Sequence, residues 1–97
     1  MITHVWGMTF NDHATAQRRE EFLQAMAELP ALTGETASFK AGADIGLNPG
    51  NSDVTIVAEF TDAQAWRNYI DAPAHQEFIE KHVNPLCASW NAIQFNS

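Results

Sequence analysis

The apolar residues of this chain switch between two spacings, and the order of the switches limits the folds that the chain can adopt. Residues 14–29 have a helical period, with an apolar stripe of Phe22, Met26 and Leu29. Pro30 and Gly34 are predicted to end this helix. Residues 2–10, ITHVWGMTF, have instead the two-residue period of a strand, one face of which carries Ile2, His4, Trp6, Met8 and Phe10.

The middle of the chain predicts two further strands joined by a loop. Residues 53–60, DVTIVAEF, are apolar on one face and partly apolar on the other, where Val57 lies, so we expect both faces to be covered. Residues 35–44 form a weaker predicted strand, and the N-P-G signal in the intervening segment indicates a loop. A last strand is predicted within SWNAIQFN, residues 89–96.

The second helical region contains a proline near its middle. Thr61 and Gln64 have the spacing of a capping box at its start. Pro73 is predicted to begin a new helix, because it lacks an amide proton and its φ angle is preset. Pro85 is predicted to end or bend that helix. The inward faces consist of Trp66, Tyr69 and Ile70 before Pro73, and of His75, Phe78, Ile79, His82, Val83 and Leu86 after it.

The predicted order is strand, helix, strand, strand, broken helix, strand, which is the order of the ferredoxin-like (split βαβ) arrangement. This α+β fold has a four-stranded antiparallel sheet with helices on one face. The 97 residues suffice for one domain, residues 1–97, and not for two. The other face would leave Val5 and Val57 in water, so we expect a homodimer in which a second sheet covers it.

Composition argues against several classes of partner. The formal net charge is −7, from twelve acidic and five basic residues, and such a chain repels nucleic acid and anionic lipid. The first residues lack the pattern of a signal peptide, and no segment approaches the length of a membrane span. The single cysteine, Cys87, allows no internal disulfide and is predicted to be a small buried hydrophobe. We therefore expect a cytoplasmic protein without a nucleic-acid or membrane partner.

The stretch YIDAPAH, residues 69–75, carries the residues with the clearest chemistry. His75 falls in the first turn after Pro73, where the helix dipole and apolar surroundings both favour the neutral imidazole that a general base needs. Tyr69 could donate a hydrogen bond to a substrate oxygen or to His75. His4 lies on the strand face beneath the helices, so two histidines and a tyrosine converge on one apolar space. Alternatively, His75 caps the helix and Tyr69 is a packed aromatic residue.

The other histidines predict no second site. His75 and His82 are seven residues apart, and neither H-x-x-x-H nor H-x-H occurs, so no metal site is predicted. His13 is expected to be solvated in the turn before the first helix, and His82 to pack against the sheet or the dimer edge. The chain has no nucleophile-elbow motif, and its glycines lack phosphate-binding spacing.

Three stretches, THVWGMTF, EFTDAQAWRNYIDAPAH and HQEFIEKHVNPL, carry a resemblance that covers essentially the whole chain. They resemble the stress-responsive dimeric α/β-barrel domain family, whose pattern has a histidine in the first strand, an acidic-Phe end to the third strand, and Tyr followed by Pro-x-His. The resemblance implies a ferredoxin-like dimer whose two sheets close into a barrel. It extends to the olivetolic acid cyclase type of polyketide cyclase within that family.

In cyclases of that type the equivalent histidine is the general base for an aldol cyclisation of a linear poly-β-ketone thioester, and the equivalent tyrosine assists. The resemblance implies a cofactor-independent cyclase or lyase with His75 as the base, Tyr69 as the oxygen-binding partner and His4 as a polar group of the pocket. Two alternatives stay open: a non-catalytic ligand-binding or stress-associated dimer, and a cofactor-free monooxygenase. The resemblance also implies a cavity lined by Trp6, Met8, Phe22, Met26, Ile56, Phe78 and Leu86.

Overall fold

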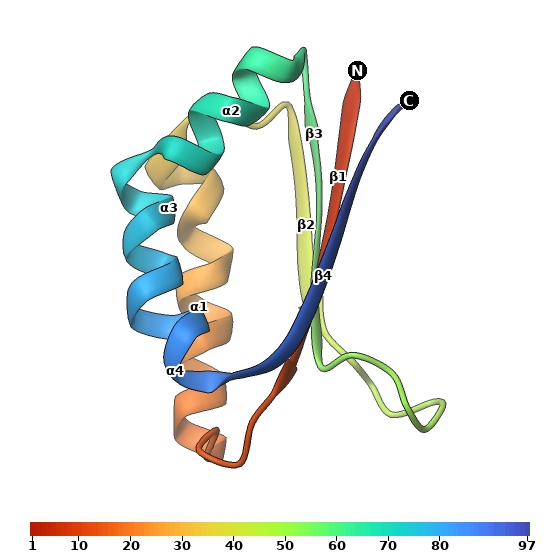
Figure 1. Ribbon diagram of the computed structural model, residues 1–97, viewed down its shortest axis with the longest axis vertical. Helices are drawn as coiled ribbons and strands as arrows, with labels where there is room; N and C mark the ends of the chain where they lie inside the picture. Colours follow the sequence, from red (N-terminus) through yellow and green to blue (C-terminus); the bar gives the residue numbers. More distant parts are fainter.

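Helices cover one face of a four-stranded antiparallel sheet in the computed structural model, which describes residues 1–97 (Figure 1). Neighbouring strands are all antiparallel, in the order β2-β3-β1-β4. The prediction of a ferredoxin-like α+β fold is confirmed. The strands are β1 (Ile2–Phe10), β2 (Ser38–Ala43), β3 (Val54–Phe60) and β4 (Cys87–Asn96).

The register of the sheet decides which residues meet beneath the helices. β1 lies in the centre, so each of its inward side chains has a neighbour on both sides. His4 pairs with Ala58 of β3 and with Gln94 of β4. Alternation along β1 then directs Trp6, Met8 and Phe10 to the same covered face, where all three are buried.

Helix α1 (Ala16–Thr33) is longer than the sequence predicted, because Pro30 does not end it. A proline removes only one backbone hydrogen bond from the helix, and the last turn is closed by other donors. The Gly34 amide donates to the Pro30 carbonyl at 2.9 Å, and Thr33 Oγ1 donates to the Leu29 carbonyl at 2.8 Å. The helix ends at Gly34, whose φ of 69° suits a glycine.

Four short helical segments follow β3: α2 (Ala63–Asp71), α3 (Pro73–Phe78), the π-helical turn η1 (Ile79–Val83) and α4 (Asn84–Leu86). The predicted capping box is wrong by one residue, since Asp62 caps α2 and its carboxylate accepts from the Ala65 amide at 2.8 Å. Pro73 begins α3, as predicted. The helical run widens at η1, where the Asn84 amide donates to the Ile79 carbonyl, and it ends at Leu86, just after Pro85.

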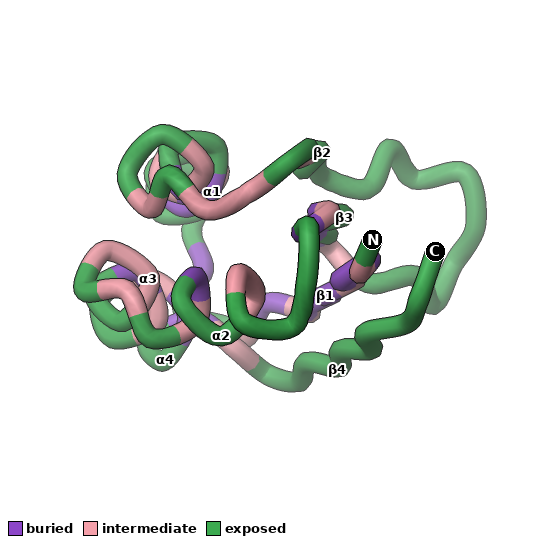
Figure 2. The backbone as a smooth tube through the Cα atoms, turned by 90° about the horizontal axis from the view of Figure 1, so that it is seen from above, coloured by how far each residue is buried: buried purple, intermediate pink, exposed green.

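The two faces of the sheet differ in their cover (Figure 2). Fifteen buried apolar residues fill the space between the sheet and the helices. The opposite face has no cover within the chain, and Val57, Ile93 and Phe95 are 38%, 59% and 47% exposed there. Cys87, predicted to be buried, is only partly buried, because it begins the edge strand β4. No helix of the chain is long and apolar enough to cross a membrane.

Candidate functional site

A cavity of about 490 Å³ lies between the covered face of the sheet and the helices that follow β3. The two helical layers divide the sheet between them: α1 lies toward β2, and α2 and α3 lie toward β4 (Figure 2). The cavity belongs to the β4 side. Its strand residues are His4, Trp6, Ile56, Trp90, Ala92 and Gln94, and its helical residues are Trp66, Tyr69, Ile70, His75, Phe78, Ile79, Val83 and Asn84.

The structure brings together the three residues with predicted chemistry, since His4, Tyr69 and His75 all line this cavity. Among the residues expected in its wall, Trp6, Ile56 and Phe78 line it as well. The other four do not line it, although they belong to the same hydrophobic core. Two of these, Phe22 and Met26, belong to α1, and each is at most 1% exposed. The four core residues are Met8, Phe22, Met26 and Leu86.

Sequence reasoning missed the contribution of β4 to the cavity. Trp90, Ala92 and Gln94 occupy alternate positions of the last strand, so they share one face. The register aligns them with Met8, Trp6 and His4 respectively, which places that face under the helices. The alternation was visible in the sequence, but only the pairing of β4 with β1 shows which face turns inward.

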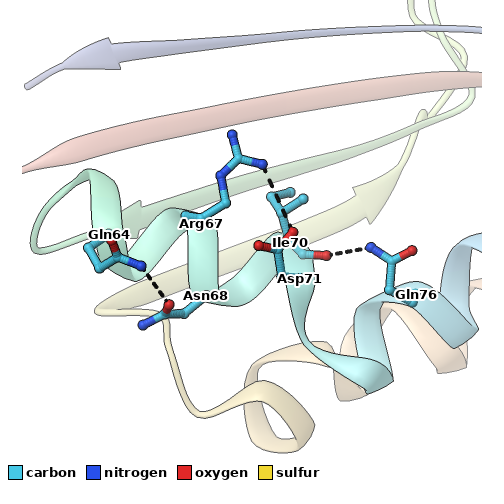
Figure 3. Close-up of polar contacts among 6 residues, drawn as sticks. All are labelled: Gln64, Arg67, Asn68, Ile70, Asp71 and Gln76. Carbon is cyan, nitrogen blue, oxygen red and sulfur yellow. Dashed lines mark hydrogen bonds and ion pairs between the residues drawn. The ribbon is translucent and has the colours of Figure 1, made fainter.

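Tyr69 and His75 lie on two different helices, which are joined by a hydrogen bond from a side chain to the backbone. Tyr69 is fully buried near the end of α2, and its ring centroid is 4.7 Å from that of His75 in α3, with an angle of 63° between the rings. Gln76 Nε2 donates to the Ile70 carbonyl at 2.8 Å, which ties the start of α3 to the end of α2 (Figure 3). The sharp bend at Pro73 therefore places the phenol and the imidazole edge to face.

Two polar atoms at this point have no hydrogen-bond partner within the protein. They are Tyr69 Oη and His75 Nδ1, and both are buried. Of the two acceptors considered for Tyr69, a substrate oxygen or His75, the phenol does not donate to His75. A buried polar atom without a partner costs roughly 1–3 kcal/mol, and proteins rarely keep one without a reason. Both atoms are therefore available to a water molecule or a ligand.

Burial favours the uncharged form of all three polar residues. Burial lowers the pKa of His75, as the sequence suggested. Burial, and then the nearby His75, lower the pKa of His4 to about 4. Burial raises the pKa of Tyr69 well above its ordinary value. The site thus presents two neutral imidazoles and a protonated phenol.

His4 is held in place by its neighbours, unlike His75. Trp66 Nε1 donates to His4 Nδ1 at 3.3 Å, and Gln94 Nε2 lies 2.9 Å from the same nitrogen. An indole N–H can only donate, so His4 Nδ1 accepts and the ring proton lies on Nε2. His4 is therefore a fixed donor, whereas no side chain of the protein sets the tautomer of His75.

The remaining histidines lie outside the cavity. His13 is exposed in the turn before α1. His82 packs against Phe22 and Phe78, with ring centroids 6.5 and 5.9 Å away, so it lies between helices and not against the sheet, which was one of the two expected positions. The helical stripe shows that the side chain of His82 faces inward, but it does not show which helix or strand that side chain contacts. No group of three or more His, Cys, Asp or Glu side chains converges on one point.

Comparison with known proteins agrees with this architecture over the whole chain. A family model described as the stress-responsive A/B barrel domain matches residues 2–97. A dimeric ferredoxin-like protein of unknown function from Thermobifida fusca is 32% identical, with a TM-score of 0.90 over 99% of this chain and 90% of that one. Comparison with proteins of curated function gives no match.

More distant structures share the fold alone. A protein from Arabidopsis thaliana is 22% identical, with a TM-score of 0.84 over 100% of this chain and 95% of that one. A hydroxynitrile lyase from Passiflora edulis is 14% identical, with a TM-score of 0.83 over 97% of this chain and 90% of that one.

Proposed function

The chain belongs to the stress-responsive A/B barrel domain family, and on that premise we propose that it is a homodimeric, cofactor-independent lyase or cyclase. His75 acts as a general base on a small carbonyl compound of polyketide-like character, and Tyr69 binds the carbonyl oxygen. The observation that carries the proposal is the pair of buried, unpartnered polar atoms, Tyr69 Oη and His75 Nδ1, in the wall of a mainly apolar cavity.

The reaction begins with removal of a proton from the carbon next to the carbonyl group. The neutral imidazole of His75 takes this proton, and the electron pair of the C–H bond moves toward the carbonyl oxygen to form an enolate. The hydroxyl of Tyr69 donates a hydrogen bond to that oxygen as its negative charge develops. Because its pKa is raised by burial, the phenol stays protonated and able to donate.

The enolate then has two possible fates, which distinguish a cyclase from a lyase. In a cyclase its carbon attacks a second carbonyl of the same molecule to form a C–C bond, and the oxygen of that carbonyl takes the proton back from His75 as its C=O π bond opens. In a lyase its electron pair forms a C=C bond and expels a leaving group from the neighbouring carbon, and the leaving group takes the proton from His75. His75 has no carboxylate partner to strengthen it as a base, so a C–H group between two carbonyls, which is unusually acidic, suits it best. This favours a poly-β-ketone skeleton.

The uncovered face of the sheet supports the homodimer. Its apolar side chains have no partner in the chain, and the similar Thermobifida fusca protein is described as dimeric. A second copy packed face to face on this surface would bury Val57, Ile93 and Phe95 and close the two sheets into a barrel. A hydroxynitrile lyase has the same fold, so lyase chemistry is accessible to it.

Exchange of α-protons in deuterated water tests the base directly, without knowledge of the natural substrate. The probe is 4-phenylbutan-2-one, an uncharged ketone whose exchange in buffer is slow, and ¹H NMR follows the loss of its α-proton signals. We expect the wild type to exceed the buffer rate and His75→Gln to lose roughly 100-fold or more of the excess. Tyr69→Phe is expected to lose about 10-fold or more.

His82→Gln is the matched control, because His82 belongs to the same helical run and lies outside the cavity. It is expected to retain the wild-type exchange rate. Equal exchange by the wild type and His75→Gln would contradict the proposed base. A ketone that binds without any exchange would favour the non-catalytic, ligand-binding alternative.

A further inference from the structure

We propose that the cavity selects an uncharged ligand with a flat aromatic body and rejects carboxylates of the same shape. This inference rests on the proposed function for the location of the site, but it concerns the ligand and not the reaction. Such a ligand is more narrowly defined than a generic carbonyl compound, because it has an aromatic body and no charged group.

The wall of the cavity contains no charged side chain. Of its fourteen residues none is Asp, Glu, Lys or Arg, and the only titratable members are His4, His75 and Tyr69. A carboxylate that enters such a space loses its hydration without gaining a cation, which costs several kcal/mol. A neutral carbonyl or hydroxyl group needs only the hydrogen bonds that Tyr69 Oη and His75 Nδ1 leave open.

The histidines are poor substitutes for a cation. To offer an anion a positive charge, His4 or His75 would have to be protonated, which burial disfavours in both residues. Each protonated ring would also repel the other. The neutral state that suits His75 for proton abstraction is thus the same state that leaves the cavity without a cation to balance the charge of a carboxylate.

The surroundings of the cavity do not supply a cation either. Arg67 lies over the ring of Trp66, with its guanidinium carbon 4.7 Å from the ring centroid, but it does not line the cavity. The carboxylate of Asp71, 3.9 Å from Arg67 Nη1, offsets its charge (Figure 3). The chain as a whole carries a net charge of −7, which repels an approaching anion.

The aromatic preference comes from the tryptophans. The chain has three, and all of them, Trp6, Trp66 and Trp90, line this cavity. Flat indole rings offer stacking and edge-to-face contacts to an aromatic ligand. Trp90 is 62% exposed on the edge strand, so it is available to the body of a ligand whose polar end lies between Tyr69 and His75.

Three ligands of the same shape separate the effect of ligand charge on binding from the effect of ligand shape. They are 4-phenylbutan-2-one, 3-phenylpropanamide and 3-phenylpropanoate, which share a phenylethyl body and differ in the polar end. Because the chain contains three tryptophans, a ¹⁵N-labelled sample gives three indole N–H signals, all from the cavity wall. We expect the ketone and the amide to shift these signals saturably, and the carboxylate to bind at least about 10-fold more weakly than the amide.

Ala92→Lys tests the cause of the selection, with Ala92→Met as the control of similar length and no charge. Ala92 lines the cavity from the exposed edge strand, so a longer side chain has room. The lysine variant is expected to bind the carboxylate better than the amide, and the methionine variant to keep the wild-type order. Carboxylate binding equal to that of the amide in the wild type overturns the inference, and so does the absence of any shift with all three ligands.

The ligand selectivity and the role of His75 as a base can be disproved independently. Tight binding of the carboxylate together with catalysed exchange of the ketone would remove the selectivity and leave the base in place. Selective binding of the ketone and amide without exchange would do the reverse.

Discussion

The two faces of the sheet are built from the same strands, yet each carries groups that its surroundings disfavour. The covered side has polar atoms away from water, and the open side has apolar side chains in water. The covered face buries polar atoms without partners, at Tyr69 and His75 above it. The open face leaves apolar side chains in water, at Val57, Ile93 and Phe95. A buried polar group and an exposed apolar group both raise the free energy of the isolated protomer. The comparison teaches that the two faces would be completed differently: the proposed ligand would pair the polar atoms of one, and the proposed second copy would cover the apolar side chains of the other.

β4 shows this contrast within ten residues. Its alternate residues Trp90 and Gln94 face the cavity, while Ile93 and Phe95 pair with Val5 and Thr3 on the open side. A shift of one residue in register would exchange the two sets and spoil both faces. The same strand therefore shapes the cavity and the proposed interface.

The largest expected difference in stability between changes on the two faces comes from removing an aromatic ring on the covered face. Phe60 is fully buried against Tyr69, with ring centroids 5.1 Å apart, so Phe60→Ala should lower the free energy of unfolding by about 3–5 kcal/mol. Phe95→Ala removes the same ring from the open face and should change the stability of the protomer far less. Urea denaturation of both variants measures the difference, and equal losses would contradict the division into faces.

A charge on the open face should break the association of the two copies. In Ile93→Asp the carboxylate stays hydrated in the protomer but would be buried in the dimer, so we expect the dimer Kd to rise about 100-fold or more. Leu32→Asp is the control, since Leu32 is similarly exposed but belongs to α1. Sedimentation equilibrium measures both. An unchanged Kd in Ile93→Asp would place the interface elsewhere.

Acid should weaken the covered face. The folded-state pKa of His4 is about 4 against an ordinary value of 6.5, and that of His75 is also lowered, so the unfolded chain binds more protons between these values. Stability is therefore full above pH 6.5 and falls as the pH drops toward 4, with at most about 3 kcal/mol from His4.

Urea denaturation across that pH range, repeated with His4→Gln, measures the contribution of His4. The variant should show a shallower loss of stability than the wild type. His13→Gln, at an exposed turn position, is the control and should keep the wild-type slope. Identical slopes in the wild type and His4→Gln would mean that His4 takes up its proton without penalty in the folded state.

Much of this architecture could be predicted from the sequence, because periodicity gives the direction of each side chain. The alternation of β1 and the break at Pro73 were enough to bring His4, Tyr69 and His75 to one side of the sheet. The competition between neighbouring residues for the N-cap of a helix was harder to predict. Asp62 caps α2 in place of Thr61, because its carboxylate accepts the hydrogen bond from the free amide of Ala65.

The position of the cavity could not be predicted from periodicity, because an inward direction does not distinguish a packed region from a hollow one. Phe22 and Met26 point inward as surely as Trp66 does, but α1 packs closely on its half of the sheet. The hollow arises where α2 and α3 bend at Pro73 over β4. That relation depends on how helices of different lengths share one sheet, which no single segment encodes.

The stability of Tyr69→Phe tests most directly the claim that the polar atoms of the covered face serve a ligand and not the fold. The change removes one buried hydroxyl without a partner and keeps the ring that packs against Phe60. We predict a free energy of unfolding equal to that of the wild type or higher by up to about 1 kcal/mol, together with slower α-proton exchange. A loss of stability of more than about 1 kcal/mol would contradict the account, because the hydroxyl would then hold the fold together.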